Sequence, residues 1–252
     1  PHTISAPRIK RADDIDPGVF DNGIDDDTFA KIVACIRIAV PYTGMIISTR
    51  ESKECRERVL HLGISQISGG SRTSVGGYAE EEPEEECSEQ FDVSDKRTLD
   101  QVVNWLMGMG YIPSFCTACY REGRTGDRFM SLCKSGQIEN CCLPNALMTL
   151  KEYLMDYASE DTRRKGLKLI DQEIARGEDP EEYSHNSPAV GSRAAQYLRD
   201  HFTGTLKAVA LDFLSLATPH DDSGDGVLAH QIMLGKFQPG YICIIEDVDM
   251  TR

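Results

Sequence analysis

The stretch that decides the fold is residues 25–68, DDDTFAKIVACIRIAVPYTGMIISTRESKECRERVLHLGISQIS. After its three leading acids, apolar residues recur at the spacing of one helix face: Ile32, Val33, Ile36 and Val40. Pro41 and Gly44 end this predicted helix. GMIISTRE then has the pattern of a buried strand, SKECRERVLHL that of a short amphipathic helix, and GISQIS that of another strand.

Upstream of this stretch, residues 3–9 (TISAPRI) predict a further short strand. The order is therefore strand, helix, strand, helix, strand, which favours parallel strands joined by crossover helices in an α/β barrel or a doubly wound sheet. Three strands cannot close a barrel and leave an exposed sheet edge, so we expect further strands before Pro1.

Downstream, the acidic run from Glu80 to Glu89 is typical of a solvated linker. Three helices are predicted after it: one with Ser94 as its N-cap, one with Pro144 near its first turn, and one closed by Gly177. We therefore expect four parts: barrel strands and helices in 1–78, an acidic linker in 79–95, a helical domain in 96–177, and a tail of unclear fold in 178–252.

Composition narrows the possible functions. The 252 residues carry a net charge of -14, which argues against a nucleic-acid binder because phosphate neutralisation needs clustered Lys and Arg. No apolar run approaches the roughly 20 residues that span a bilayer, so no membrane partner is expected.

The nine cysteines are odd in number, which argues against a full disulfide framework. Clustered thiols instead indicate metal or redox chemistry in a reducing compartment, the cytoplasm or an anaerobic organelle.

The cysteines cluster around a C-x-x-C formed by Cys116 and Cys119, with Cys133, Cys141 and Cys142 following. Such a hairpin aims two thiolates at one point, and a third from a following loop completes a face. Three thiolates suit a 4Fe–4S cluster with one open iron, whereas four suit zinc or a closed cluster, and spacing alone does not separate iron–sulfur from zinc. The remaining cysteines in apolar or helical patterns are expected to be buried, inert thiols: Cys35, Cys55 and Cys243.

Several segments together resemble the HydG family, the radical-SAM tyrosine lyases that mature di-iron hydrogenase. They are HTISAPR, AVPYTGMIISTRE, GISQISGGSRTSVGGY and the long cysteine-bearing stretch YIPSFCTACYREGRTGDRFMSLCKSGQIENCCLPNALMTLKEYLMDYA, and the likeness extends over about residues 1–176. The resemblance implies the last strands of a radical-SAM (β/α)8 barrel followed by a mostly helical cluster-binding domain. It also implies a carbon–carbon lyase of the 2-iminoacetate synthase type, which cleaves L-tyrosine to p-cresol plus carbon monoxide and cyanide.

The resemblance further implies cofactors and partners. An auxiliary 4Fe–4S cluster with an additional iron falls on Cys116, Cys119 and Cys141, with Cys142 as the alternative third ligand. S-adenosyl-L-methionine and a second 4Fe–4S cluster serve the full-length enzyme, and other hydrogenase maturation proteins receive the iron–carbon monoxide–cyanide unit. The C-x-x-x-C-x-x-C motif of the second cluster is absent from the sequence, so we expect this chain to be inactive alone. His2 is a weak candidate for the outer-iron ligand.

By the same resemblance Ser48 and Arg50, at the end of a predicted strand, contact bound tyrosine. An arginine can hold a carboxylate bidentately, although a structural ion pair with a barrel acid is the alternative. SGGSRTSVGG either cradles an anion or is a plain loop, and three arginines either balance thiolate charge or are solvated surface: Arg121, Arg124 and Arg128. A self-standing iron–sulfur or zinc module, or a scaffold for metal delivery, is the alternative function.

Overall fold

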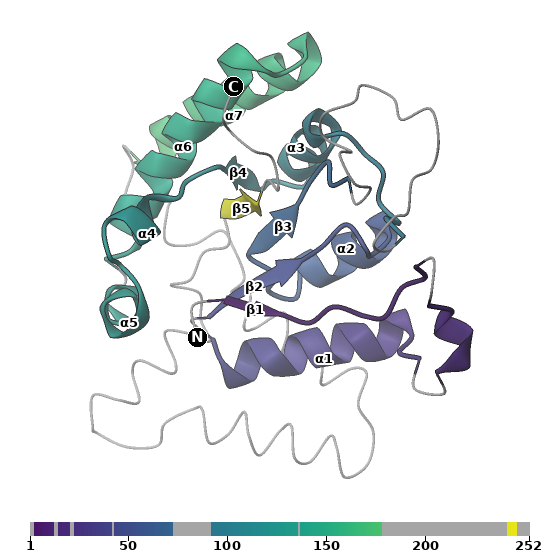
Figure 1. Ribbon diagram of the computed structural model, residues 1–252. Coiled ribbons are helices and arrows are strands. Elements are labelled where there is room, and N and C mark those ends of the chain that lie inside the picture. Colours follow the sequence, from purple (N-terminus) through teal and green to yellow (C-terminus); the bar gives the residue numbers. More distant parts are fainter. Residues whose placement is uncertain are drawn as a thin grey trace.

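A parallel sheet organises the chain (Figure 1). The computed structural model describes residues 3–12, 15–20, 23–41, 43–72, 92–135, 137–177 and 241–245. Within these ranges five strands pair in parallel in the order β1-β2-β3-β5-β4. Their bounds are β1 Thr3–Ser5, β2 Gly44–Ile47, β3 Gln66–Ser68, β4 Ile112–Ser114 and β5 Tyr241–Ile245. The expected α/β class with a parallel sheet is confirmed.

Helices connect the strands as the sequence predicts. The described helices are η1 Pro17–Val19, α1 Asp26–Ala39, α2 Lys53–Leu60, α3 Leu99–Gly108, α4 Ala118–Arg121, α5 Gly126–Lys134, α6 Glu139–Asp156 and α7 Glu160–Gly177. The Asp25 carboxylate caps α1 by accepting from the Thr28 N–H at 2.7 Å, and the Ser52 hydroxyl caps α2. Among the described residues no helix combines the length and apolarity that crossing a bilayer requires.

One hydrophobic core lies between the sheet and its helices. Met45, Ile47 and Ile67 of β2 and β3 belong to this core together with Phe29 and Val33 of α1. The same cluster continues through α3, β4, α6 and α7, so the helical residues after position 96 share the core of the first strands. Because successive side chains along a strand point to opposite faces, the residues between these core positions form the other face of β1–β3.

Three details correct the sequence analysis. The first strand ends at Ser5 instead of continuing to residue 9. The N-cap of α3 is Thr98, not Ser94, because Thr98 and Gln101 form a reciprocal capping box. Pro144 lies inside α6, which begins at Glu139, more than a turn before it.

Two strands were not predicted as part of the sheet. β4 covers Ile112–Ser114 and contains Pro113, which is tolerated because β4 is the last strand in the sheet order. β5 includes Cys243, as its strand-like pattern indicated, but its position between β3 and β4 was not foreseen. The acidic run Glu80 to Glu89, the predicted tail apart from β5, and His2 lie outside the described residues.

A buried ion network fixes the end of β3 against α2 and α3. Arg56 is fully buried; its guanidinium donates to Asp95 and to the Ser68 carbonyl, and Arg97 donates to the same carboxylate at 2.8 Å. Burial lowers the pKa of Arg56 to about 10. At the same point Gly70 has a φ of +66°, and a Cβ there would lie 3.3 Å from the Leu99 backbone nitrogen. The loop after β3 therefore packs tightly against the start of α3.

Candidate functional site

Ser48 and Arg50 lie directly after β2, at the carboxyl edge of the sheet. The Arg50 N–H donates to the Ser48 hydroxyl at 3.3 Å, and the Glu51 N–H donates to the Ser48 carbonyl at the same distance. Both side chains are half-buried. The turn thus holds the two predicted substrate residues together at the edge where parallel α/β folds bind ligands.

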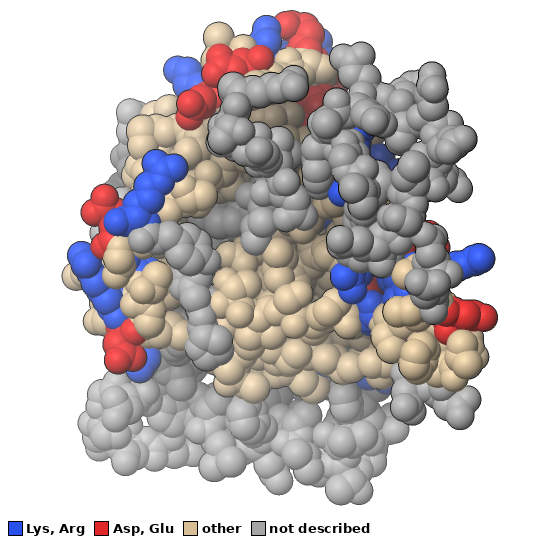
Figure 2. Space-filling view, in the orientation of Figure 1, with Lys and Arg blue, Asp and Glu red and all other residues tan. Residues whose placement is uncertain are grey.

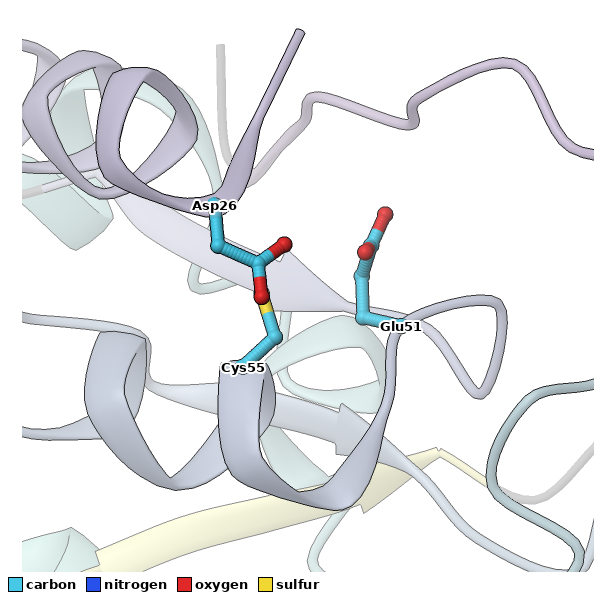
Figure 3. A group of neighbouring side chains, drawn as sticks. All are labelled: Asp26, Glu51 and Cys55. Atoms are coloured by element: carbon cyan, nitrogen blue, oxygen red, sulfur yellow. The ribbon is translucent and has the colours of Figure 1, made fainter. Parts of the chain in front are cut away.

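An ion cluster that is buried at Glu51 and Cys55 and open to solvent at Asp26 adjoins this turn. We call Arg8, Lys10, Asp26, Glu51 and Cys55 the sheet-edge cluster. The Arg8 Nε lies 3.1 Å from both Glu51 oxygens, and another Arg8 nitrogen lies 2.7 Å from Asp26 and 3.4 Å from the Cys55 sulfur. Lys10 adds a second cation 3.5 Å from Glu51. Figure 3 shows Asp26 of α1 and Cys55 of α2 pointing toward one another, with Glu51 entering from the turn before α2.

The sheet-edge cluster has the spacing of a metal site but is filled by a guanidinium. The possible ligand atoms of Asp26, Glu51 and Cys55 lie within 4.8 Å of one another. Arg8 donates to all three, so the positive charge they need comes from the protein itself. Burial alone lowers the pKa of Arg8, but hydrogen bonds to Glu51 and Asp26 outweigh it and raise that pKa overall. Burial also raises the pKa of the Cys55 thiol to about 11.

The sheet face opposite the core is polar. By strand register, Thr3, Ser5, Gln66 and Ser68 share the face of Ile46, while Met45, Ile47 and Ile67 take the core face. Parallel sheets are usually apolar on both faces, so a face of hydroxyls and an amide is unusual. Among the described residues, the buried Thr3 Oγ1 and Gln66 Oε1 have no hydrogen-bond partner. Such orphaned polar atoms are typical of a surface that receives water or a polar ligand.

The second region is the cysteine site, which we define as Cys116, Cys119 and Cys141. Cys116 follows β4, and its N–H donates to the Ser114 hydroxyl at 3.3 Å. Cys119 lies in α4, directly beyond the turn in which the Ala118 N–H approaches the Cys116 sulfur at 3.5 Å. Cys141 lies in the first turn of α6, not in a loop as the sequence suggested. All three are half-buried, and none forms a disulfide.

Arg124 joins two members of the cysteine site. Its guanidinium donates to the Cys119 sulfur, and this hydrogen bond raises the pKa of Arg124, with added attraction to Cys119 and Cys141. Its backbone N–H donates to the Cys119 carbonyl at 2.8 Å. The edge formed by α4 and α5, at the left of Figure 2, carries basic and acidic side chains side by side. The positive charge near the sulfurs therefore comes from Arg124 and not from a uniformly basic surface.

Neighbouring cysteines differ from the three in their surroundings. Cys133 of α5 is buried, and desolvation raises the pKa of its thiol to about 12, which is typical of an inert structural cysteine. Cys142 adjoins Cys141 in α6 and is half-buried. Cys55 is buried as expected, but Cys35 is exposed, so its predicted burial is wrong. The side chain of Cys243 lies outside the described residues.

The spacing of the three sulfurs bears on which group they could hold. Within the described residues, they do not form a trio of ligand atoms within 4.8 Å of one another. A tetrahedral zinc ion with bonds of about 2.3 Å requires sulfurs roughly 4 Å apart. Sulfurs that bind separate irons of one cluster lie farther apart, because the cluster itself separates them. In this geometry the three sulfurs are not gathered around one tetrahedral ion, and half-buried thiols are soft donors of the kind that an iron–sulfur cluster also uses.

Comparisons with known proteins match the N-terminal strands and helices of the chain to one family. Residues 5–112 match the family described as Biotin and Thiamin Synthesis associated domain. The chain is 32% identical over 113 residues to the 2-iminoacetate synthase of Escherichia coli (strain K12), which covers 44% of this chain and 28% of that protein. The Salmonella typhimurium enzyme of the same name is 30% identical over the same shares.

Solved structures extend the match beyond the sheet. A crystal structure of HydG, described as a maturase of the [FeFe]-hydrogenase, has a TM-score of 0.65 and 48% identity, covering 81% of this chain and 42% of that one. The chain is similar to the C-terminal half of HydG. HydG from Carboxydothermus hydrogenoformans gives a TM-score of 0.52 and 36% identity, covering 79% of this chain and 39% of that one. The resemblance recognised in the sequence is confirmed, and the chain spans less than half the length of these relatives.

The sequence analysis missed the sheet-edge cluster and did not distinguish among the three arginines near the cysteines. The sheet-edge cluster was not foreseen, because its members come from separate segments of the chain and no local pattern pairs them. The three arginines around the cysteines were treated alike, whereas Arg121 is exposed and Arg128 donates to the Glu122 carbonyl at 3.2 Å. Arg124 alone among the three hydrogen-bonds a cysteine sulfur in the described contacts.

Proposed function

We propose that this chain is part of a radical-SAM tyrosine lyase of the HydG type, which converts L-tyrosine to p-cresol, carbon monoxide and cyanide for the di-iron hydrogenase cofactor. The similarity to HydG, at 48% identity over 81% of the chain, carries the proposal. On this proposal the parallel strands are the last strands of an eight-stranded barrel. The polar face of β1–β3 lines its interior.

The cysteine site is proposed to hold the auxiliary 4Fe–4S cluster with its additional iron. Cys116, Cys119 and one cysteine from the first turn of α6 supply three thiolates, which leaves one iron of the cluster open. Cys141 is our assignment for the third thiolate, supported by its attraction to Arg124, and Cys142 is the alternative. When bound, the group collects the diatomic products on iron.

The turn after β2 is proposed to bind L-tyrosine. Arg50 supplies a planar fork of N–H donors for the substrate carboxylate, and Ser48 supplies a hydroxyl beside it. Glu51, the acid next in sequence, is bound by Arg8 and Lys10. A structural ion pair of Arg50 with an acid is the alternative to the substrate role, and the titration described below distinguishes the two.

Radical generation is proposed to depend on residues outside this sequence. The 252 residues contain no C-x-x-x-C-x-x-C, so they do not fit the cluster that cleaves S-adenosyl-L-methionine. No step of that chemistry is therefore assigned to this chain. Its proposed partners are the residues or polypeptide that carry this motif, and the maturation proteins that accept the iron–carbon monoxide–cyanide unit.

Anaerobic reconstitution of the full chain with iron and sulfide tests the metal assignment. We expect about four irons and four sulfides per cluster, plus the additional iron, and loss of the 4Fe–4S absorbance and EPR signals in Cys116→Ser and Cys119→Ser. Cys35→Ser is the matched control, because that cysteine is exposed and lies in α1. Comparing Cys141→Ser with Cys142→Ser identifies the third ligand.

Two outcomes would contradict the metal assignment. Cluster spectra that persist when Cys116, Cys119, Cys141 and Cys142 are all serine would remove the site. Stoichiometric zinc with no iron–sulfur signal after reconstitution would favour the stand-alone zinc module instead.

Calorimetric titration with L-tyrosine and with L-tyrosine amide tests the substrate site. We expect Arg50→Lys to weaken tyrosine binding about tenfold or more, since a bidentate charged contact contributes about 1.5–3 kcal/mol. The amide lacks the carboxylate, so its binding should change little. Arg58→Lys, which alters an exposed ion pair with Asp27, is the control. Equal losses for both ligands would contradict the carboxylate role, and p-cresol formed by this chain alone would contradict an external radical source.

A further inference from the structure

Residues 92–97 tie together the carboxyl ends of neighbouring strands. The Asp92 N–H donates to the Arg11 carbonyl at 2.8 Å, and the Asp95 N–H donates to the Thr49 carbonyl at 3.0 Å. Arg11 lies beyond β1 in the chain, and Thr49 lies just beyond β2, which pairs with β1 in parallel. The segment between the described strands and α3 therefore holds the edge of the sheet that carries the proposed tyrosine site.

Thr49 is the residue between the two proposed tyrosine contacts, Ser48 and Arg50. Its side chain is buried, whereas those of its two neighbours are half-buried. The Thr49 carbonyl and the Arg50 N–H belong to one planar peptide unit. The carbonyl end accepts from the Asp95 N–H at 3.0 Å, and the N–H end donates to the Ser48 hydroxyl at 3.3 Å. Asp95 thus helps to fix the peptide from which the Arg50 side chain begins.

Two arginines fix Asp95 in turn. Its carboxylate accepts from Arg56 of α2 and from Arg97, whose Nε lies 2.8 Å from one carboxylate oxygen. The side chains of Asp95 and Arg56 are 1% and 0% exposed. Arg56 also donates to the Ser68 carbonyl at the end of β3. Because a buried charge is costly without its partner, this arrangement resists loosening and holds Asp95 in place relative to the ends of β2 and β3.

The amino ends of the same strands are held by a comparable arginine. Arg37 of α1 is buried, and its guanidinium donates to the Gly63 carbonyl at 3.0 Å and to the Thr43 carbonyl at 2.9 Å. Gly63 and Thr43 come before β3 and β2, respectively. Burial lowers the pKa of Arg37 and of Arg56 to about 10. The two arginines are therefore similar in burial, but Arg37 acts at the strand ends remote from the proposed tyrosine site.

We propose that Asp95 is a positioning residue of the tyrosine site, which holds the Thr49–Arg50 peptide so that the Arg50 guanidinium meets the substrate carboxylate with two N–H donors. The proposal rests on the tyrosine site proposed above and deepens it. Binding groups must be held within about 0.5 Å of their productive geometry, so a small shift of this peptide weakens a bidentate contact. An Asp95 that is purely structural would affect stability without changing the preference for a carboxylate.

The test measures that preference in the full chain by calorimetric titration with L-tyrosine and with L-tyrosine amide. The readout is the dissociation constant of the amide divided by that of L-tyrosine, measured where circular dichroism shows each variant to be folded. We expect Asp95→Asn to lower this ratio about tenfold, roughly the effect of losing one hydrogen bond between charged groups. Arg56→Gln should lower the ratio as well. Arg37→Gln is the matched control: it should lower the midpoint of urea denaturation and leave the ratio unchanged.

The outcomes separate this proposal from the proposed function. A wild-type chain that does not prefer L-tyrosine to its amide refutes the proposed tyrosine site and this inference with it. A wild-type preference that persists in Asp95→Asn refutes the role of Asp95 alone, and an equal loss of preference in Arg37→Gln does the same. If Asp95→Asn does not fold, Arg97→Gln decides, because Arg97 holds the same carboxylate and its side chain is 18% exposed. A lowered ratio in Arg97→Gln supports the proposal, and an unchanged ratio overturns it.

Discussion

The sheet-edge cluster and the cysteine site are built in opposite ways. Glu51 is 2% exposed and is held by Arg8 through both carboxylate oxygens, with Asp26, Lys10 and Cys55 around it. The cysteine site has half-buried sulfurs, a four-residue helix and an α5 N-cap without a side-chain hydrogen bond. One region supplies its own counter-charge, whereas the other presents soft ligands with a single bridging cation.

This difference indicates which region needs a cofactor to become rigid. A carboxylate that is buried and bidentately paired is fixed by folding alone, so the turn carrying Ser48 and Arg50 is preorganised for its ligand. Cysteines that lack their metal gain order from the group they bind. The described contacts therefore indicate a rigid sheet edge beside a cysteine site that the proposed cluster would complete.

The largest expected effect is a loss of stability at the sheet-edge cluster. Glu51→Gln removes the charge that Arg8 and Lys10 share and leaves the partly buried Arg8 guanidinium with Asp26 as its remaining carboxylate. We expect the free energy of unfolding to fall by about 1.5–3 kcal/mol, the usual contribution of a hydrogen bond to a charged group. Urea denaturation followed by circular dichroism measures it. Glu54→Gln, an exposed acid in the first turn of α2, should cost less than about 1 kcal/mol; similar losses in both variants would contradict a special role for Glu51.

Cluster binding should stabilise the region around the cysteine site and leave the sheet-edge cluster unchanged. At a free cluster concentration about 100 times its dissociation constant, linkage stabilises the bound region by about 2.7 kcal/mol. We expect amide hydrogen exchange in α4 and α5 to slow by about 100-fold on reconstitution, while amides in β2 and α2 change little. Mass spectrometry of peptides from both regions gives the comparison. Equal protection of the two regions would show that they form one cooperative unit, which would break the contrast.

Much of the rigid region could be predicted from the sequence. The helix pattern of residues 25–40 and the short strands around residues 44–51 and 63–68 are local signals, and the structure has α1, β2 and β3 there. Asp25 and Ser52 act through near neighbours, so such caps are visible in sequence. The cap at Thr98 was missed because the choice between it and Ser94 depends on the reciprocal hydrogen bond from Gln101.

What could not be predicted depends on long-range pairing. β4 is three residues long and contains a proline, which is too short for an alternating pattern to be recognised. β5 pairs with strands more than 100 residues earlier, and no local pattern specifies that position. The Arg8–Glu51 pair spans 43 residues, so no local pattern in the sequence joins the two charges. The cysteines were found from their spacing, because ligand spacing is a local property, yet spacing did not single out Arg124.

A smaller effect on stability is expected when the pH is raised, through Cys55 of the sheet-edge cluster. The pKa of the Cys55 thiol is raised to about 11, first by burial and then by Asp26, whereas an unfolded thiol titrates near 8.5. Between about pH 8.5 and 11 the folded state keeps a proton that the unfolded state loses, so stability falls as pH rises. Replacing Cys55 by alanine should remove this component, which is on the order of 1 kcal/mol, and should leave the slope below pH 8 unchanged. Parallel slopes for both proteins up to pH 11 would show that Cys55 is not protected.

The smallest effect should come from the cysteine site before any cluster is bound. Cys116 and Cys119 are half-buried, and the contacts described for their sulfurs are a weak backbone approach at 3.5 Å and the Arg124 hydrogen bond. Serine at either position keeps a polar group of similar size, so the cluster-free chain should lose less than about 0.5 kcal/mol of unfolding free energy. The same substitutions should abolish cluster binding, which makes function and folding separable at these residues. A loss of 2 kcal/mol or more in the cluster-free variants would mean that the cysteines are part of the core. The cysteine site would then be as preorganised as the sheet edge.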